Sequence, residues 1–205
     1  MAFINELWFT NGMARPRSIT DERLLAAAET VIGRVGPGFT LAQVAAQAGV
    51  AVGTVAQRFG SKAGLLQALS RRATASAVER MRACADAADD PVAGLRDAAV
   101  TVYAVLGDAE EAANHLGQLG VDIGDPVLRA LLGEHYAAVE RELRRLVRQV
   151  SLPHGPGAER AARTLLAVIN GVSIDWSVRP EGRLADRLAE DVDAVLAAWR
   201  GREDA

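Results

Sequence analysis

The stretch that decides the fold is residues 40–62, TLAQVAAQAGVAVGTVAQRFGSK. Thr40 is a good helix N-cap, and Gln43 three positions later completes a capping box, so a helix should begin here. Gly49 should end that helix, because glycine readily supplies the left-handed backbone of a helix C-terminus. A second short helix follows and should point Val55 inward. The stretch therefore predicts a helix-turn-helix, a unit that presses its second helix against DNA.

The outer surface of that second helix should lie where base edges and phosphates are found. Among the side chains there, glutamine is suited to adenine and arginine to guanine. This outer surface consists of Ala51, Val52, Gly53, Thr54, Ala56, Gln57 and Arg58.

The same stretch resembles the DNA-binding segment of the tetracycline-repressor (TetR/AcrR) family of bacterial regulators. The family pattern is satisfied in register and without gaps by Thr40, Val44, Ala45, Ala48, Gly49, Val50, Gly53, Thr54, Val55, Phe59, Ser61, Lys62 and Leu65. The resemblance implies a sequence-specific DNA-binding transcriptional regulator, with a repressor as the family default. It also implies roles for single residues: Thr40, Gly53, Thr54 and Lys62 hold the phosphate backbone, while Gln57 and Arg58 face the major groove.

Three positions depart from the family pattern. Ala51, Val52 and Ala56 stand where the family usually has a hydroxyl cap, a basic residue and an aromatic hydroxyl. A lost cap costs about 1 kcal/mol of helix stability, and each lost phosphate contact lowers the salt slope of binding by about one. Val52 and Ala56 can instead touch thymine methyl groups. These departures keep open an alternative, a helical protein-interaction module with weakened or no DNA binding.

Charge is distributed unevenly along the chain. The net charge is −3, but residues 13–72 carry eight Arg or Lys against three Asp or Glu, and the remainder from Ala73 onward carries 15 basic against 22 acidic residues. A basic head on an acidic body favours docking of one end of the molecule to phosphates. Chance clustering of solvated arginines is the alternative explanation.

Residues 1–19 are expected to form a flexible arm. The segment that begins at Met13, MARPRSITDERLL, has the features of a natural N-terminus, so we expect that translation can begin there. Arg15 and Arg17 can reach phosphates or a minor groove, as arms do in other helical DNA-binding domains. A disordered tail without such contacts is the alternative.

The whole chain shows helical periodicity, which predicts an all-α fold of about nine helices. A three-helix helix-turn-helix domain over residues 20–66 should be followed by a larger helical bundle over 67–205, which serves effector binding and dimerisation. The fourth helix should run from the head into the body without a linker. Helices are expected at about 21–35, 91–106, 109–119, 126–150, 158–178 and 183–199, with a loop at 151–157.

The resemblance implies that the last two helices pack against their copy in a second subunit. Reading two half-sites about 34 Å apart also requires a two-fold dimer, so the partner is a second copy of the chain. Ordinary core within one chain remains the alternative for each residue. The candidate interface residues are Leu165, Ile169, Val172, Leu188, Val192, Val195 and Trp199.

Regulators of this kind carry a mostly apolar pocket among their middle helices, so a small, largely apolar effector is expected. Its binding should favour a dimer whose recognition helices are wrongly spaced, releasing a palindromic operator. Each candidate can also be purely structural, because buried Tyr and Trp commonly tie off one polar atom. The candidates are Tyr103, Gln118, Asp122, Tyr136 and Trp176, with His115 and Asn170 as further polar groups.

Other classes of protein find little support in the sequence. It has no phosphate loop, G-x-S-x-G elbow or paired histidines at metal-ligand spacing, so neither an enzyme nor a cofactor or metal is expected. The single cysteine, Cys84, excludes an internal disulfide. No apolar stretch approaches the roughly 20 residues that span a bilayer. A cytoplasmic protein without membrane contact is expected.

Overall fold

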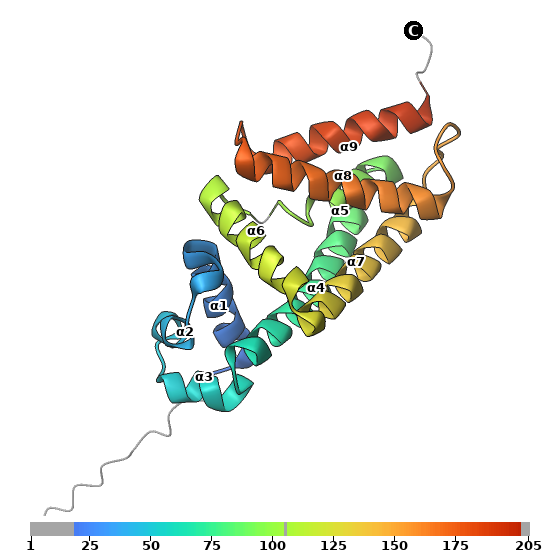
Figure 1. The fold of residues 1–205 in the computed structure, drawn as a ribbon. Coiled ribbons are helices and arrows are strands. Elements are labelled where there is room, and N and C mark those ends of the chain that lie inside the picture. Colours follow the sequence, from blue (N-terminus) through green and yellow to red (C-terminus); the bar gives the residue numbers. More distant parts are fainter. Residues whose placement is uncertain (1–18, 105, 202–205) are drawn as a thin grey trace, which may run out of the picture.

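The computed structural model describes residues 19–104 and 106–201, and these residues form nine α-helices, one 3-10 turn and no strand (Figure 1). The prediction of an all-α fold with about nine helices is confirmed. The helices are α1 (Asp21–Val35), α2 (Leu41–Ala48), α3 (Val52–Phe59), α4 (Lys62–Ala87), α5 (Pro91–Val100), α6 (Ala109–Gly124), α7 (Pro126–Val147), α8 (Ala158–Val178) and α9 (Leu184–Arg200), with the 3-10 turn at Gly36–Gly38.

Capping residues set the ends of the helices in the N-terminal domain, which consists of α1 to α3 and the start of α4 and is called the head below. The Thr40 hydroxyl accepts the backbone N–H of Gln43 at 3.3 Å, and the Gln43 side chain accepts the backbone N–H of Thr40 at 2.8 Å. Gly49 adopts the left-handed conformation with φ 71° and ψ 34°. The predicted capping box and helix stop are therefore confirmed, and the predicted first helix matches α1 at both ends.

The head has its own hydrophobic core, drawn mainly from α1 to α4. Val55 of α3 is fully buried in it, and so are Leu24, Val44 and Leu65. The first turns of α7 also contribute, through Leu128 and Leu131. The head core is thus completed by a helix that begins 67 residues after the end of α3 in the chain.

The longest helix, α4, joins the two parts of the molecule. It begins at Lys62 beside α3 and runs to Ala87 in the body, which confirms the continuous connection (Figure 1). The expected division between residues 66 and 67 falls within it.

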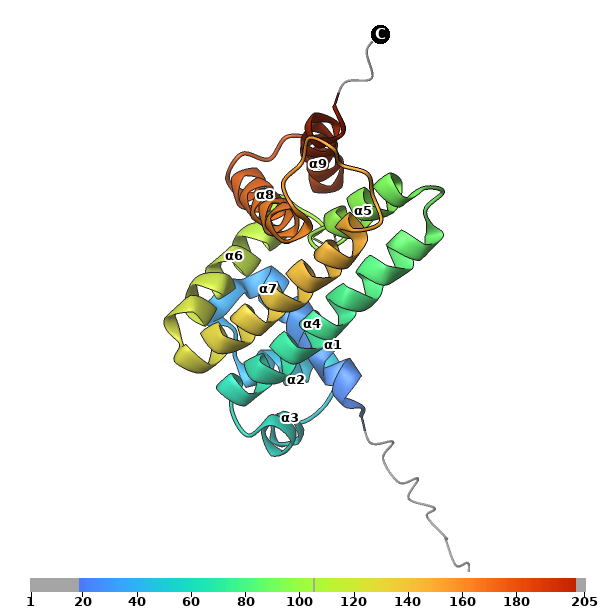
Figure 2. The same cartoon turned by 90° about the vertical axis from the view of Figure 1, so that its right-hand side faces the viewer.

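Both views place α7 alongside α4 (Figure 2). Between them, the buried carboxylate of Glu142 accepts from Arg82 at 3.2 Å and from Arg145 at 2.7 Å. A buried carboxylate is tolerated because it is paired.

The core of the body contains buried residues of α4 to α9. Helices α8 and α9 lie together at the end of the molecule away from α3 (Figure 2). Three helix ends differ from the sequence prediction, and one of them is that of α7, which ends at Val147 rather than near residue 150. The helix that begins at Pro91 ends at Val100 rather than near residue 106, and α6 extends to Gly124 rather than 119. After Val100 the chain tightens into turns with bonds from Val102 to Ala99 and from Tyr103 to Val100. The β-branched run at 100–102 has low helix propensity, which helps to explain the early end.

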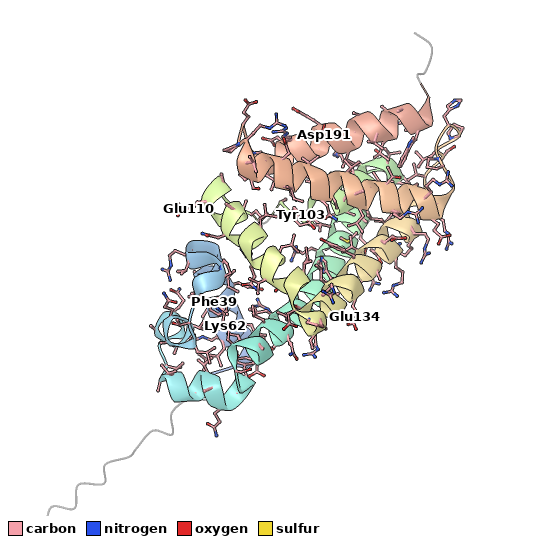
Figure 3. The ribbon with its side chains drawn as sticks, viewed as in Figure 1. Phe39, Lys62, Tyr103, Glu110, Glu134 and Asp191 are labelled. Atoms are coloured by element: carbon pink, nitrogen blue, oxygen red, sulfur yellow. The ribbon has the colours of Figure 1, made fainter. Side chains whose placement is uncertain are left out.

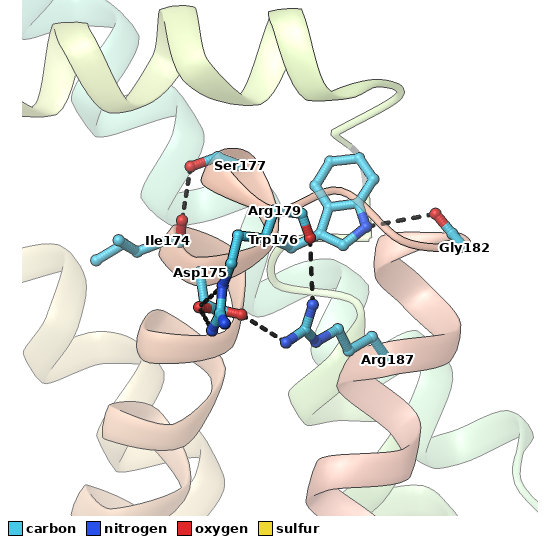
Figure 4. A network of polar contacts seen from close by, with 7 residues as sticks. All are labelled: Ile174, Asp175, Trp176, Ser177, Arg179, Gly182 and Arg187. Atoms are coloured by element: carbon cyan, nitrogen blue, oxygen red, sulfur yellow. Dashed lines mark hydrogen bonds and ion pairs between the residues drawn. The ribbon is translucent and has the colours of Figure 1, made fainter.

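A polar network holds the turn between α8 and α9 (Figure 4). The carboxylate of Asp175 accepts from Arg179 and, at 2.5 Å, from Arg187 of α9. The hydrogen bond from Arg179 is the main cause that lowers the pKa of Asp175. The indole N–H of Trp176 donates to the carbonyl of Gly182 at 3.3 Å.

Candidate nucleic-acid interface and internal cavity

One surface of α3 faces away from the head core. Gly53, Gln57 and Arg58 are exposed, and Val52 is 45% exposed. Thr54 and Ala56 are half-buried at the edge of this surface. Because Val55 on the opposite side is fully buried, the orientation of the helix is fixed. The structure therefore places all of the expected contact residues of α3 on or beside one accessible face.

The start of α3 has no side-chain cap. Ala51 is the N-cap residue, and its extended backbone at φ −71° and ψ 147° is suited to a cap, but it has no hydroxyl to accept a hydrogen bond. The backbone N–H groups of Val52 and Gly53 consequently keep their capacity to donate, whereas that of Thr54 donates to the carbonyl of Ala51 at 2.9 Å. Such groups, at the positive end of the helix dipole, form a ready site for a phosphate.

Arg58 is held by the beginning of the head. Its guanidinium donates to the carboxylate of Asp21 at 2.6 Å and to the carbonyl of Ile19 at 3.4 Å. Both charged side chains remain substantially exposed, at 42% and 49%. The arginine therefore lies at the accessible face of α3 with a defined intramolecular partner.

Lys62 has internal partners. Its ammonium group donates to the carbonyls of Pro37 at 2.6 Å and Phe39 at 2.8 Å, and lies 4.2 Å from the centroid of the Phe39 ring (Figure 3). These contacts tie the start of α4 to the turn that precedes α2. The expected phosphate contact of Lys62 stays a prediction, and so does that of Thr40, whose hydroxyl serves the capping box. Arg15, Arg17 and the start expected at Met13 lie outside the described residues.

The body contains a cavity of about 250 Å³ between α4, α6, α7 and α8. Four of the five candidate residues line it: Tyr103, Gln118, Asp122 and Tyr136. His115 and Asn170 line it as well. The structure thus brings together residues from a turn and three helices that are separated by up to 67 positions in the chain.

Hydrogen bonds order the polar groups of this cavity. The side-chain amide of Gln118 donates to Asp122 at 2.8 Å, and the hydroxyl of Tyr103 donates to the side-chain oxygen of Asn170. Burial raises the pKa of Asp122, although the bond from Gln118 acts in the opposite direction. Burial also raises the pKa of Tyr103, so its hydroxyl stays protonated and remains a donor.

Sequence reasoning missed His135 as a lining residue. It follows Leu131 and Leu132 at helical spacing and precedes Tyr136, so the shared face of α7 was visible in the pattern. Its Nδ1 lies 3.2 Å from the hydroxyl of Thr74, and burial lowers its pKa. The imidazole is therefore neutral near pH 7. Other missed lining residues are Ser70, Ser173 and Ser177.

Trp176 does not line this cavity. Its side chain is almost fully buried, and it packs in the body core with its N–H tied to Gly182 at the end of α8 (Figure 4). Trp176 is on the buried face of α8, whereas Ser173 and Ser177 nearby on the same helix reach the cavity. The alternative given for Trp176, a purely structural role, therefore accounts for its contacts.

The candidate interface residues lie in the chain's own core. Four of them, Leu165, Ile169, Leu188 and Val192, are fully buried, and Val172, Val195 and Trp199 pack against the same cluster. The most apolar stripe of each helix thus packs inside its own subunit. The outward stripe of α8 is different and carries smaller or isolated apolar residues, namely Ala167, Gly171, Ile174 and Val178, of which Ile174 also lines the cavity.

Residues 19–104 and 106–201 contain neither a membrane-spanning helix nor a metal-binding cluster. In that part of the chain, no helix combines the length and apolar character that a bilayer crossing needs. No three His, Cys, Asp or Glu side chains there come together in a way that could hold a metal ion.

Two family models match the chain. Residues 24–69 match bacterial regulatory proteins of the tetR family, and residues 121–200 match the C-terminal part of a BetI-type transcriptional repressor. The first match covers the head helices, and the second covers the end of α6 and α7 to α9. No curated protein matches the sequence.

Solved structures of low sequence identity share the fold. A transcriptional regulator from Rhodococcus sp. RHA1 superposes with a TM-score of 0.70 at 22% identity, over 90% of this chain and 100% of the other. FadR from Bacillus subtilis, in complex with stearoyl-CoA, gives 0.70 at 18%, over 87% and 99%. SmeT, the repressor of the Stenotrophomonas maltophilia multidrug efflux pump SmeDEF, gives 0.67 at 24%, over 88% and 90%.

Proposed function

This chain belongs to the tetR family of bacterial regulatory proteins, and we propose that it is a homodimeric repressor which leaves a palindromic operator when a small, largely apolar ligand fills its cavity. The observation that carries the proposal is the accessible face of α3. Gln57 and Arg58 lie exposed on it while Val55 anchors the helix from behind. The N–H groups at the uncapped start of α3 supply a phosphate site beside them.

The proposed ligand response needs a physical link between cavity and head, and α6 supports one. Gln118 and Asp122 of this helix line the cavity. One turn earlier, the side-chain amide of Asn114 donates to the carbonyl of Gly33 at the end of α1, at 2.8 Å. A ligand that displaces α6 would therefore shift the contact between body and head.

The same link continues toward the DNA-binding face. A Cβ placed on Gly117 would lie 3.3 Å from the ring of Pro37, so α6 packs closely on the turn at Gly36–Gly38. Lys62 ties that turn to the start of α4. Displacement of α6 would thus act on both the turn before α2 and the helix after α3, and so on the spacing of the recognition helices in a dimer. Typical couplings of about 1–3 kcal/mol would change operator affinity by about 5- to 150-fold.

For the dimer, we propose the outward stripe of α8 in place of its buried stripe. Ala167 and Gly171 allow close approach of a second helix, and Val178 is 71% exposed. The exposed alanines Ala194, Ala197 and Ala198 of α9 extend the same kind of small-residue surface. A two-fold pair through these helices would present two α3 helices to one duplex. Since bacterial DNA lies in the cytoplasm, we propose that location for the protein.

The function is tested by selecting bound duplexes from random DNA and measuring their affinity by fluorescence anisotropy at several salt concentrations. A repressor of this kind should select a palindrome and lose affinity steeply as salt rises. The double variant Gln57→Ala with Arg58→Ala should abolish the sequence preference while keeping the fold.

A helical protein-interaction module is the second candidate, and the missing polar groups at Ala51 and Ala56 favour it. The same experiment separates the two functions. Absence of binding to every duplex at low salt would support the interaction module and refute the repressor.

A further inference from the structure

The cavity in the body has an unusual balance of charge. Its described lining contains no lysine or arginine, and Asp122 is its one carboxylate. Two histidines line it, and burial keeps His135 neutral by lowering its pKa. No cationic side chain lies within 4.0 Å of the Asp122 carboxylate among the described residues. A carboxylate without a positive partner, half-buried in an apolar wall, favours a ligand that carries the missing charge.

Gln118 supplies a second, independent observation. Its side chain is 94% buried, which follows from its exposed fraction of 6%. Its amide N–H donates to Asp122, and its carbonyl oxygen has no hydrogen-bond partner. A buried acceptor without a donor costs about 1–3 kcal/mol. The arrangement therefore lacks a hydrogen-bond donor beside Gln118 and Asp122.

A third hydrogen-bond acceptor of the lining, after Asp122 and Gln118, is the imidazole of His135 on α7. The Thr74 hydroxyl donates to the carbonyl of Ser70 at 2.9 Å, so it can only accept from the Nδ1 of His135. The neutral imidazole consequently carries its proton on Nδ1 and leaves Nε2 as an acceptor. The lining thus holds at least three acceptors that a ligand donor can use, on Asp122, Gln118 and His135.

We infer that the ligand of this cavity is an apolar amine, whose protonated nitrogen pairs with the carboxylate of Asp122 and gains the side-chain oxygen of Gln118 as a second acceptor when that side chain turns toward it. This inference rests on the proposed function and names the ligand class for the same site. The apolar part of the ligand lies against Leu116, Leu119, Leu131 and Leu132. An engineered cavity of about 150 Å³ binds benzene, so about 250 Å³ accommodates one aromatic ring with a short chain.

Anionic ligands fit this lining poorly. FadR from Bacillus subtilis is similar in fold and is in complex with stearoyl-CoA, an anionic thioester. The described lining of the present cavity offers no lysine or arginine to a phosphate or carboxylate, and Asp122 would repel either. The two proteins therefore share a fold and differ in the class of ligand they accept.

Three probes of nearly equal size and shape test the inference: 4-phenylbutylamine, 4-phenylbutanol and 4-phenylbutyrate. Their binding to the full-length protein is measured by isothermal titration calorimetry at pH 7, without DNA. The amine should bind at least tenfold more tightly than the alcohol, and the carboxylate should bind most weakly. Equal affinities, a preference for the carboxylate, or no binding of any probe would overturn the inference.

Variants identify the groups that select the amine. Asp122→Asn should remove most of the preference for the amine over the alcohol, while Gln118→Met, which keeps the side-chain length, should reduce it in part. Glu134→Gln is the matched control, because Glu134 is exposed on α7 outside the cavity (Figure 3). Circular dichroism checks that each variant is folded. If Asp122→Asn keeps the full preference, the proposed site is wrong.

The probes are measured without DNA, so the outcome is independent of operator binding. A chain that selects the amine but binds no duplex would retain this inference and refute the repressor. A chain that binds a palindrome but shows no preference for the amine would do the reverse.

Discussion

Arg58 on the accessible face of α3 donates to the carboxylate of Asp21 in the first turn of α1, with 2.6 Å between Nη1 and Oδ1. Both side chains remain exposed to solvent, so the pair contributes only about 0.2–1 kcal/mol. An incoming guanine or phosphate can therefore displace Asp21. In the proposed complex, the pair would hold the arginine near the groove and would compete only weakly with DNA.

Asp21→Asn should strengthen binding to DNA. Releasing Arg58 and removing a negative charge from the interface should raise affinity by up to about fivefold, which corresponds to the free energy of an exposed pair. Anisotropy titrations at constant salt measure the change. Glu22→Gln is the control, since it removes the same charge from the same turn, and Glu22 has no ion pair in the described structure. Weaker binding by the Asp21 variant would contradict the competition.

Lys62→Met should destabilise the head. It leaves the carbonyls of Pro37 and Phe39 without their donor and removes the cation from the Phe39 ring. The expected cost is about 1–3 kcal/mol, or a fall in Tm of several degrees for a chain of this size. Arg71→Met, on an exposed position of α4, should change Tm little. Equal melting of both variants would show that these contacts of Lys62 do not stabilise the head.

Ala51→Thr should restore a cap to α3. The backbone of Ala51 already has the extended conformation of an N-cap, so a hydroxyl there should stabilise the helix by about 1 kcal/mol. Ala51→Val is the matched control, because valine has the shape of threonine without its hydroxyl. Chemical denaturation measures the difference between the two variants. If both variants have the same stability, the backbone N–H groups at the start of α3 do not gain from a hydroxyl cap.

Gly171→Arg should produce a monomer. A Cβ at Gly171 meets no atom within 4 Å, so the side chain fits the isolated subunit. In the proposed dimer it would place like charges across the two-fold axis and weaken association by about a hundredfold or more. Gly133→Arg, on an equally open position of α7, is the control. Sedimentation equilibrium measures both, and a dimeric Gly171 variant would exclude this face.

Asn114→Ala should weaken the link between cavity and head. It removes the bond to the carbonyl of Gly33, so ligand binding should change operator affinity less, by about 0.5–2 kcal/mol. Glu110→Gln, on the exposed side of α6, is the control. The comparison is made by titrating each variant with operator DNA in the presence and absence of the amine. An unchanged response would remove α6 from the proposed route.

Features set by neighbouring residues were predictable from the sequence. The cap at Thr40, the left-handed Gly49 and the bounds of α1 follow from local chemistry, and the structure shows each of them. Four of the expected residues also line the cavity, and three of them are polar groups on otherwise apolar helix faces; their contact with a ligand stays a prediction.

Features set by distant contacts were not predictable. Helical periodicity shows that Leu165 and Ile169 are buried, but it does not say whether a second copy or the same chain covers them. Likewise, the partners of Arg58 and Lys62 come from segments that are 23 or more positions away. Those contacts form only when the head has folded, so the sequence of either segment alone does not reveal them.

The contribution of Leu128 and Leu131 to the core of the head makes the DNA-reading part inseparable from its body. A fragment that stops after α4 would expose the apolar surface which these two leucines cover. Grafting a foreign reading head onto this body would require matching substitutions in the first turns of α7. In the proposed repressor, substitution of single side chains on α3 should therefore alter specificity more readily than exchange of the whole head.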